Sequence, residues 1–349
     1  MKSNNLIITI GLSAVLLTTC QDSTGPQPPK PGKRDYVWSI DSISYPGSLQ
    51  TTLYTIWGSS SKDVYAGGSN ERGWGELYHY DGNSWQVVIH GYRAIDIHQI
   101  YGFGADDVYL AGGYIYTNPA PPPNFLDSSV ILHYDGSRWK EVPLERGRGL
   151  QGIWGPSPQN MFSAGIFGTL YKDNGKRWTR LPADTNIFFS TIGGIPDEIY
   201  LLGYTPNGYT PDHTGREYLL QWKDTNFIVV DSMLLLPGIV AKFGSSRVIG
   251  VQGKIYSAGW GGIFIKSGTS WTKELDTSPQ SIYNIYGTRK EHIFASGTNK
   301  TLYHYNGTNW KILEIPGDSL LPLFGIWCNE DEVFVLGENN SKSYVIHGK

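Results

Sequence analysis

A short motif recurs along this chain and constrains its fold more than any other feature. Each copy carries aliphatic and aromatic residues, then a turn that contains Gly, and then a tryptophan. Clear copies lie at 77–85, 132–139 and 302–310, and weaker ones lie at 170–178 and 265–271. A unit that returns in this way indicates a repeat architecture, in which neighbouring copies bury one continuous core. Residues that recur with the unit are therefore expected to be structural.

The complete unit, seen first at residues 56–88, contains four short runs separated by Gly, Asn, Asp or Ser turns. The alternation and the β-branched and aromatic content of these runs predict four strands, here a to d, joined as an antiparallel meander. The strand-a signature, of the type Ile-Trp-Gly, marks seven units that begin at Ile56, Ile100, Ile153, Ile192, Val248, Ile285 and Ile326. Four-stranded units at a spacing of roughly 40 to 50 residues are typical of propeller blades. The sequence therefore predicts an all-β fold, a seven-bladed β-propeller with four-stranded antiparallel blades.

The seventh unit lacks its strand d, because the sequence ends shortly after the run 343–348. A run with the features of strand d, Tyr36-Val37-Trp38-Ser39-Ile40, stands before the first strand a. Pairing of this N-terminal run with the last blade would close the ring and remove the free edges of an open sheet array. We therefore expect the last blade to be completed by the N-terminal strand.

The strand-b runs end in Gly67-Gly68 in the first unit and in Gly112-Gly113 in the second. Each is followed by a tyrosine, then by Asp-Gly and a tryptophan, and this order resembles the kelch-type propeller unit. The resemblance covers nearly all of the chain after residue 34. It implies a propeller fold and a binding role, and it implies no reaction, because propellers support many unrelated functions.

The N-terminal segment has the features of a targeting signal. Lys2 is followed by an apolar run at 6–17, which is short for a bilayer span. The run ends in Leu17-Thr18-Thr19-Cys20, which resembles the lipobox of bacterial lipoproteins, with Thr19 where Gly, Ala or Ser is usual. We expect a signal peptide at 1–19, a lipidated Cys20 followed by a Pro/Gly-rich tether at 20–34, and a propeller at 35–349. The expected location is the bacterial cell envelope, at the outer membrane or cell surface rather than the inner membrane.

Composition excludes some partners. The net charge of −3 leaves no electrostatic footprint for nucleic acid. Cys20 and Cys328 are the two cysteines of the sequence, so lipidation of Cys20 would leave no disulfide. Cys328 falls in a strand-a signature and is expected to be a small core residue.

The polar and aromatic residues that recur with the unit have structural interpretations. Equivalent positions of different blades lie far apart in a propeller, so we expect no shared metal site at His79, His133 and His304. Acidic residues before strand b, such as Asp63 and Asp107, are expected to shape the a–b turn. Large aromatic residues are expected to pack between neighbouring sheets, at Trp85, Trp139, Trp178, Trp271 and Trp310. No metal-ligand spacing, nucleophile elbow, phosphate loop or dinucleotide fingerprint is present in the sequence, so no cofactor, metal or catalytic residue is predicted.

Three insertions break the repeat, at 69–76, 114–128 and 204–217, and all three lie between strands b and c. In a meander the b–c connections of every blade emerge on one face, together with the d–a crossovers. Aromatic residues interleaved with amides and charges on exposed loops suit the recognition of carbohydrate or peptide. The candidate binding residues are Arg72, Trp74, Tyr114, Tyr116, Tyr204, Tyr209 and His213.

The favoured interpretation is a monomeric, lipid-anchored extracytoplasmic propeller that binds a glycan, peptide or envelope protein through its b–c loop face. A first alternative is an extracytoplasmic polysaccharide hydrolase or lyase that uses carboxylates such as Asp212 or Glu217. A glycosidase would need two facing carboxyl groups about 5 to 10 Å apart. A second alternative is a scaffold subunit of an envelope complex. The sequence favours a binding protein over an enzyme.

Overall fold

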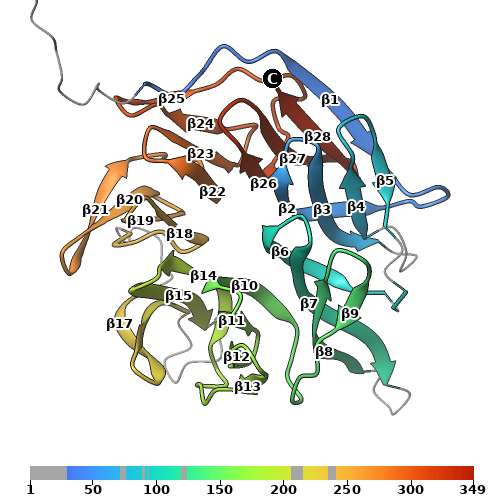
Figure 1. Cartoon of the computed structure of the whole chain (residues 1–349). Coiled ribbons are helices and arrows are strands. Elements are labelled where there is room, and N and C mark those ends of the chain that lie inside the picture. Colours follow the sequence, from blue (N-terminus) through green and yellow to red (C-terminus); the bar gives the residue numbers. More distant parts are fainter. Residues whose placement is uncertain are drawn as a thin grey trace, which may run out of the picture. The chain divides into compact units, whose positions relative to one another are not determined.

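The computed structural model describes residues 30–70, 76–88, 91–92, 94–118, 124–205, 215–234 and 241–349, with the backbone alone at 115–118 and 124–127. Residues Pro31–Lys349 form one compact unit. In this unit the described strands form seven four-stranded antiparallel sheets, which follow one another around a ring (Figure 1). The predicted seven-bladed propeller with four-stranded antiparallel blades is therefore confirmed.

Each of the first six blades takes four consecutive strands, with strand a innermost. Blades 1 to 3 are β2 (Thr51–Ser60), β3 (Asp63–Asn70), β4 (Leu77–Tyr80), β5 (Trp85–Val87); β6 (Asp96–Gly104), β7 (Asp107–Asn118), β8 (Asn124–Tyr134), β9 (Trp139–Glu141); and β10 (Leu150–Ser157), β11 (Asn160–Gly165), β12 (Leu170–Asp173), β13 (Trp178–Arg180). Blades 4 to 6 are β14 (Phe188–Ile195), β15 (Glu198–Thr205), β16 (Arg216–Lys223), β17 (Asn226–Leu234); β18 (Arg247–Val251), β19 (Lys254–Gly259), β20 (Gly262–Ser267), β21 (Ser270–Leu275); and β22 (Ile282–Arg289), β23 (His292–Gly297), β24 (Leu302–Tyr305), β25 (Trp310–Ile312).

Blade 7 joins the two ends of the propeller. It contains β26 (Leu323–Cys328), β27 (Val333–Asn339) and β28 (Lys342–Gly348), and β1 (Trp38–Ile43) pairs antiparallel with β28 as its outer strand (Figure 1). The register runs from Trp38 opposite Gly348 to Ile43 opposite Ser343. The expected closure by the N-terminal strand is confirmed, although the strand starts and ends two to three residues later than the run at 36–40 suggested.

Four residues of the expected tether belong to the propeller, because the compact unit begins at Pro31 rather than at Asp35. The Arg34 guanidinium donates hydrogen bonds to Asn309 Oδ1 and to the His304 carbonyl, both at 2.9 Å. The Gly32 backbone also lies against blade 6, where an added Cβ would come within 2.4 Å of the Glu291 carbonyl oxygen. These contacts attach the start of the unit to blade 6 before β1 reaches blade 7.

The recurring tryptophans pack between neighbouring blades, as expected. The ring of Trp139 in blade 2 lies 6.0 Å from that of Tyr65 in blade 1, and Trp271 in blade 5 lies 5.7 Å from Tyr200 in blade 4. The others share hydrophobic clusters with the strand-b aromatic residue of the preceding blade: Trp85 with Phe334, Trp178 with Tyr109, and Trp310 with Tyr256. Such aromatic pairs contribute about 0.5–1.5 kcal/mol beyond the area that they bury.

The recurring histidines of strand c have structural partners in their own blades. Each packs against the strand-b aromatic residue: His79 lies tilted on Tyr65 with ring centroids 4.4 Å apart, and His133 stacks on Tyr109 at 4.2 Å. The acidic residue that opens strand b hydrogen-bonds to the histidine, and in blade 1 Asp63 also accepts a hydrogen bond from Ser59 across the a–b turn, as expected. The pairs are His79–Asp63 at 2.6 Å, His133–Asp107 at 2.8 Å and His347–Glu332 at 2.6 Å.

A β-bulge near the start of strand a explains the recurring glycine at the end of strand b. In blades 1 and 2 the ladder shifts register after Leu53 and after Ile97, which lie opposite Gly68 and Gly112. A Cβ on Gly112 would lie 1.9 Å from the Asp96 carbonyl oxygen. The two backbones approach too closely at the bulge for any side chain, so glycine is required there.

Cys328 is a free cysteine with 1% of its surface exposed, in agreement with its expected place in the core. Burial raises the pKa of its thiol well above the usual range, so the group is an uncharged packing residue. Within the part of the chain that the structure describes, no helix has the length and apolar character needed to cross a membrane.

Candidate functional site

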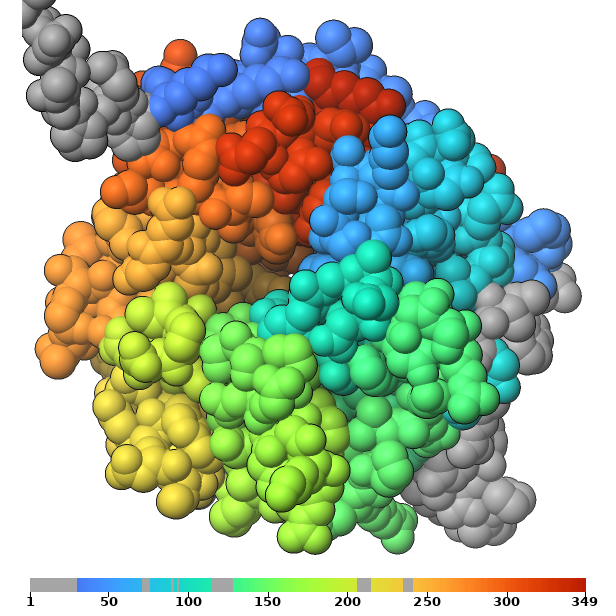
Figure 2. Space-filling view, viewed as in Figure 1, coloured from blue at the N-terminus to red at the C-terminus, as the bar shows by residue number. Residues whose placement is uncertain are grey.

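The seven strands a converge on an axial cavity of about 260 Å³. The space-filling view shows the hollow around which the blades are arranged (Figure 2). Every strand a contributes to the wall, and the aromatic members are Trp57, Tyr101, Trp154 and Tyr286. Propeller ligands need a concave site with a few well-placed polar groups, and this cavity is the concave site common to all seven blades.

Arg247 is the cationic residue of the cavity wall. It begins β18, where the equivalent positions of the other blades carry Thr55, Gln99, Gly152, Thr191, Asn284 and Gly325. Two of these polar residues link neighbouring blades, since Ile100 N donates to Thr55 Oγ1 at 3.0 Å and Ile153 N donates to Gln99 Oε1 at 3.2 Å. Arg247 therefore replaces a linking residue by a long positively charged side chain.

The Arg247 guanidinium has few partners. Its Nη1 donates a long hydrogen bond of 3.4 Å to Thr191 Oγ1, and its buried Nε has no partner among the described residues. Burial lowers its pKa to about 10, and the guanidinium remains charged near neutral pH. A buried cation is costly unless a counter-charge accompanies it. The arrangement suits a ligand that brings an anionic group, and a carboxylate matches the planar fork of the guanidinium.

Aromatic residues at the strand-a bulges stand where strand a enters the ring, on the face of the b–c connections. Tyr54 of blade 1 stacks on His98 of blade 2 with ring centroids 5.7 Å apart, and Tyr283 of blade 6 stacks on Phe324 of blade 7 at 5.4 Å. Burial lowers the pKa of His98 to about 4, so its ring is neutral at physiological pH. These aromatic residues directly precede or flank wall residues of the cavity such as Thr55 and Asn284, but they do not line it themselves.

The structure describes only part of the sequence-predicted site. Arg72, Trp74, Tyr209, His213 and the rival carboxylate Asp212 lie outside the described residues, as does the side chain of Tyr116. Tyr204 is 39% exposed at the end of β15, with its ring edge-on to Phe188 at 5.8 Å. It is the candidate aromatic residue that the structure leaves accessible on the b–c loop face.

Tyr114 differs from the expectation of an exposed loop aromatic. It is 4% exposed, and its hydroxyl donates to Glu141 Oε2 at 3.2 Å. The reason is that the second insertion is not an irregular loop: β7 and β8 continue through it as a hairpin, with Tyr114 opposite Ser128 and Asn118 opposite Asn124. Tyr114 is thus a core residue of blade 2, and we withdraw it from the binding candidates.

Glu217, the other rival carboxylate, lies in β16 between Tyr204 of β15 and Met233 of β17. Burial raises its pKa, and a hydrogen bond with Ser245 opposes that shift. Among the described residues, no group of three or more His, Cys, Asp or Glu side chains is arranged to hold a metal ion.

Sequence reasoning missed Arg247 and the two stacked aromatic pairs. The signal for Arg247 was present, because one blade alone carries a charge at a strand-a position that is small or polar elsewhere. Its importance depends on all seven strands meeting at one axis. The aromatic pairs join residues of different blades, so the sequence of a single blade does not show that they meet.

No family model matches the sequence, and no curated protein matches it. Solved structures do match over most of the chain. YCF48 bound to D1 peptide has a TM-score of 0.61 at 14% identity, and the match covers 91% of this chain and 99% of that one. The WD40 β-propeller domain of Doa1 has a TM-score of 0.57 at 11% identity, with 88% and 96% covered.

The extracellular domain of the putative hybrid two component system BT4673 from B. thetaiotaomicron is also similar, with a TM-score of 0.61 at 14% identity. That match covers 89% of this chain and 39% of the other. At these identities the likeness concerns the fold. The chain is similar to propellers of several kinds, one of them in complex with a peptide and one an extracellular domain.

Proposed function

We propose that this protein is a non-catalytic binding module that holds an extended peptide segment of a partner on its b–c loop face, with a carboxylate of the peptide at Arg247. The observation that carries the proposal is the half-buried guanidinium of Arg247, whose buried Nε has no partner among the described residues. A bidentate carboxylate would supply the missing counter-charge and hydrogen bonds. The similarity to a propeller in complex with D1 peptide supports a peptide over other ligands.

The loops of blades 1, 2 and 4 would extend this site. We propose that Trp74, Tyr116, Tyr204 and Tyr209 contact the parts of the ligand that remain outside the channel, with Arg72 and His213 as polar contacts. In binding loops on rigid scaffolds, aromatic side chains provide large contact areas at low entropic cost. The kelch-like unit would then serve as the scaffold and the insertions as the variable recognition surface.

Replacing Arg247 tests the proposal. Arg247→Met keeps an unbranched aliphatic side chain and removes the charged guanidinium, so binding of peptides with a free C-terminal carboxylate should fall at least about tenfold. Stability should be unchanged or higher, because an unpaired buried charge is removed. The measurement is fluorescence anisotropy with a peptide library in free-acid and amidated forms, with a thermal melt of each variant.

The exposed Arg177, in the c–d turn of blade 3, provides the matched control. Arg177→Met should bind as the parent does. Equal binding by Arg247→Met and the parent would contradict the proposal. If the protein binds acidic oligosaccharides and no peptide, the ligand is a glycan and the peptide proposal is wrong. Turnover of a polysaccharide that Glu217→Gln abolishes would instead support the enzyme alternative, for which the raised pKa of Glu217 is the favourable feature.

We also propose that Cys20 carries a lipid anchor, that residues 1–19 are a signal peptide and that the protein belongs to the bacterial cell envelope. The sequence around Cys20 and the similarity to an extracellular bacterial domain support this. Cys20→Ala should lose all incorporation of a fatty-acid analogue during metabolic labelling, since the cysteine thiol is the acceptor. Cys328→Ala is the control and should label fully. Equal labelling of Cys20→Ala and the parent would refute the anchor.

A further inference from the structure

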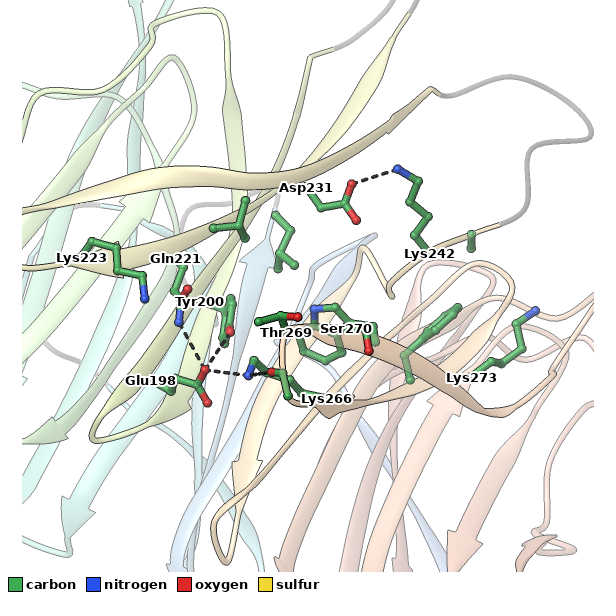
Figure 3. A pocket seen from close by; sticks show the side chains of 16 residues that line it. Glu198, Tyr200, Gln221, Lys223, Asp231, Lys242, Lys266, Thr269, Ser270 and Lys273 are labelled. Atoms are coloured by element: carbon green, nitrogen blue, oxygen red, sulfur yellow. Dashed lines mark hydrogen bonds and ion pairs between the residues drawn. The ribbon is translucent and has the colours of Figure 1, made fainter.

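A second cavity, of about 750 Å³, lies between blades 4 and 5 and is separate from the axial channel. Its walls come from β15, β16 and β17 on one side and from β20 and β21 on the other (Figure 3). Trp271 lines it and meets Tyr200 edge-on at 5.7 Å, which provides an aromatic floor. We call this cavity the blade 4–5 groove.

One wall of the groove is an exposed apolar edge strand. Ile228 and Val229 are each 50% exposed and Val230 is 44% exposed, three in succession on β17. Val230 is the extra residue of a bulge, because Leu220 pairs with Val229 and Leu219 with Asp231, and it lines the groove. A run of exposed apolar residues on an edge invites pairing unless the fold blocks it.

β17 differs from the outer strands of the other blades. It has nine residues, whereas β5, β9, β13 and β25 have three each, and β1 and β21 have six. Every second backbone N–H and C=O of an outer strand points away from its sheet. Blade 4 therefore presents the longest row of backbone groups that an extended segment could pair with.

The groove carries an excess of positive charge. Four lysines line it against two carboxylates: Lys223, Lys242, Lys266 and Lys273 against Glu198 and Asp231. Lys266 pairs with Glu198 at 2.7 Å, Lys242 with Asp231 at 2.9 Å, and Lys273 with Asp276 outside the groove lining at 3.2 Å. Lys223 is exposed, and its side-chain amino group has no hydrogen bond or ion pair with a described residue. Figure 3 shows the two ion pairs on opposite sides of the open groove.

We propose that an extended acidic and apolar segment of a partner protein adds to β17 as a fifth strand of blade 4. Alternate side chains of a strand point to opposite faces of its sheet. One set of side chains of the added segment would therefore lie over the groove, and the other set would cover exposed residues of β17. On the groove side Lys223, Gln221 and Leu219 share a face of β16, and Lys223 is placed to meet an acidic side chain.

Charge selects this occupant over a second copy of the chain. Two copies paired through β17 would bring two lysine-rich grooves together, and like charges at an interface are unfavourable. A segment with acidic residues at alternate positions is instead attracted by the lysines of the groove. The backbone pairing supplies affinity, and the lysines supply the preference for acidic side chains.

The test uses the mature full chain and a defined probe, a fluorescent ten-residue peptide of alternating valine and glutamate with blocked ends. Val229→Glu places a negative charge on the exposed edge, next to the acidic probe, and should weaken binding at least about tenfold. Lys223→Glu should weaken binding of this peptide and improve binding of the matched valine and lysine peptide. Ile312, 55% exposed on the outer strand β25 of blade 6, provides the control, and Ile312→Glu should bind as the parent does.

The other outcomes overturn the proposal. Absence of binding to the parent, or equal binding by Val229→Glu, would remove the edge strand as a docking site. A dimer that Val229→Glu converts to a monomer in size-exclusion chromatography would make a second copy the occupant. Loss of binding in Arg247→Met would place the probe in the axial channel. Thermal melts show whether each variant is folded, and an exposed substitution should change stability by less than about 0.5 kcal/mol.

Discussion

A chain that starts at Pro46 should melt far below one that starts at Pro31, because it lacks the strand that closes the ring. β1 pairs with β28 along six residues and brings Tyr36 and Ile43 into the core, where they are 8% and 3% exposed. Losing such side chains costs about 2–5 kcal/mol each. The expected loss of about 5 kcal/mol or more is comparable with the whole stability of many domains. Thermal and urea melts of the two chains measure it.

The control is a chain that starts at Pro31 and carries Ile40→Ser. Ile40 belongs to β1 but is 39% exposed, so its replacement should change stability little while the strand pairing stays intact. Similar melting temperatures for the chains that start at Pro31 and at Pro46 would show that the ring does not depend on β1.

Lowering the pH from 7 to 5 should destabilise the propeller through its buried histidines. His304 is fully buried, and burial together with the charge of His292 lowers its pKa from 6.5 to about 3. Burial also lowers the pKa of His292 and His347. Below pH 6.5 this histidine binds a proton in the unfolded chain but not in the folded protein. The free energy of unfolding is therefore highest, with respect to His304, above pH 6.5, and it declines as the pH falls below that value. His304 alone should account for about 2 kcal/mol at pH 5.

His304→Gln isolates this effect. Gln221 stands at the equivalent position of blade 4, opposite the strand-b aromatic residue, so glutamine fits the site without a titrating ring. The free energy of unfolding of the variant should fall less between pH 7 and pH 5 than that of the parent, by about 2 kcal/mol. Burial raises the pKa of Glu217 and Glu338, so these carboxyl groups stabilise the folded protein as the pH falls and oppose the effect of the histidines. The quantity to measure is therefore the difference in pH dependence between the variant and the parent. Identical pH dependence of the two proteins would contradict the assignment.

Several features of the fold could be predicted from the sequence, because each follows from a local pattern that repeats. The strand-a signature located all seven blades, including blade 5, whose copy at Val248-Ile249-Gly250 is degenerate. The missing strand of the last unit predicted closure by the N-terminal run, because a sheet edge gains by being paired. Repetition also identified Trp139 and His133 as structural residues, since a feature shared by several blades does not mark one site.

Other features depend on how distant segments meet, and only the tertiary structure decided them. The second insertion was expected to be an exposed loop because it interrupts the repeat, yet cross-strand pairing extends β7 and β8 into it and buries Tyr114. Arg247 becomes a candidate ligand contact because seven strands from separate parts of the chain enclose it. The blade 4–5 groove requires β17 and β21 to face each other across two sheets. The sequence alone determined the repeating unit and its number, because strand periodicity is local, whereas closure of the ring decided which non-repeating side chains share a cavity.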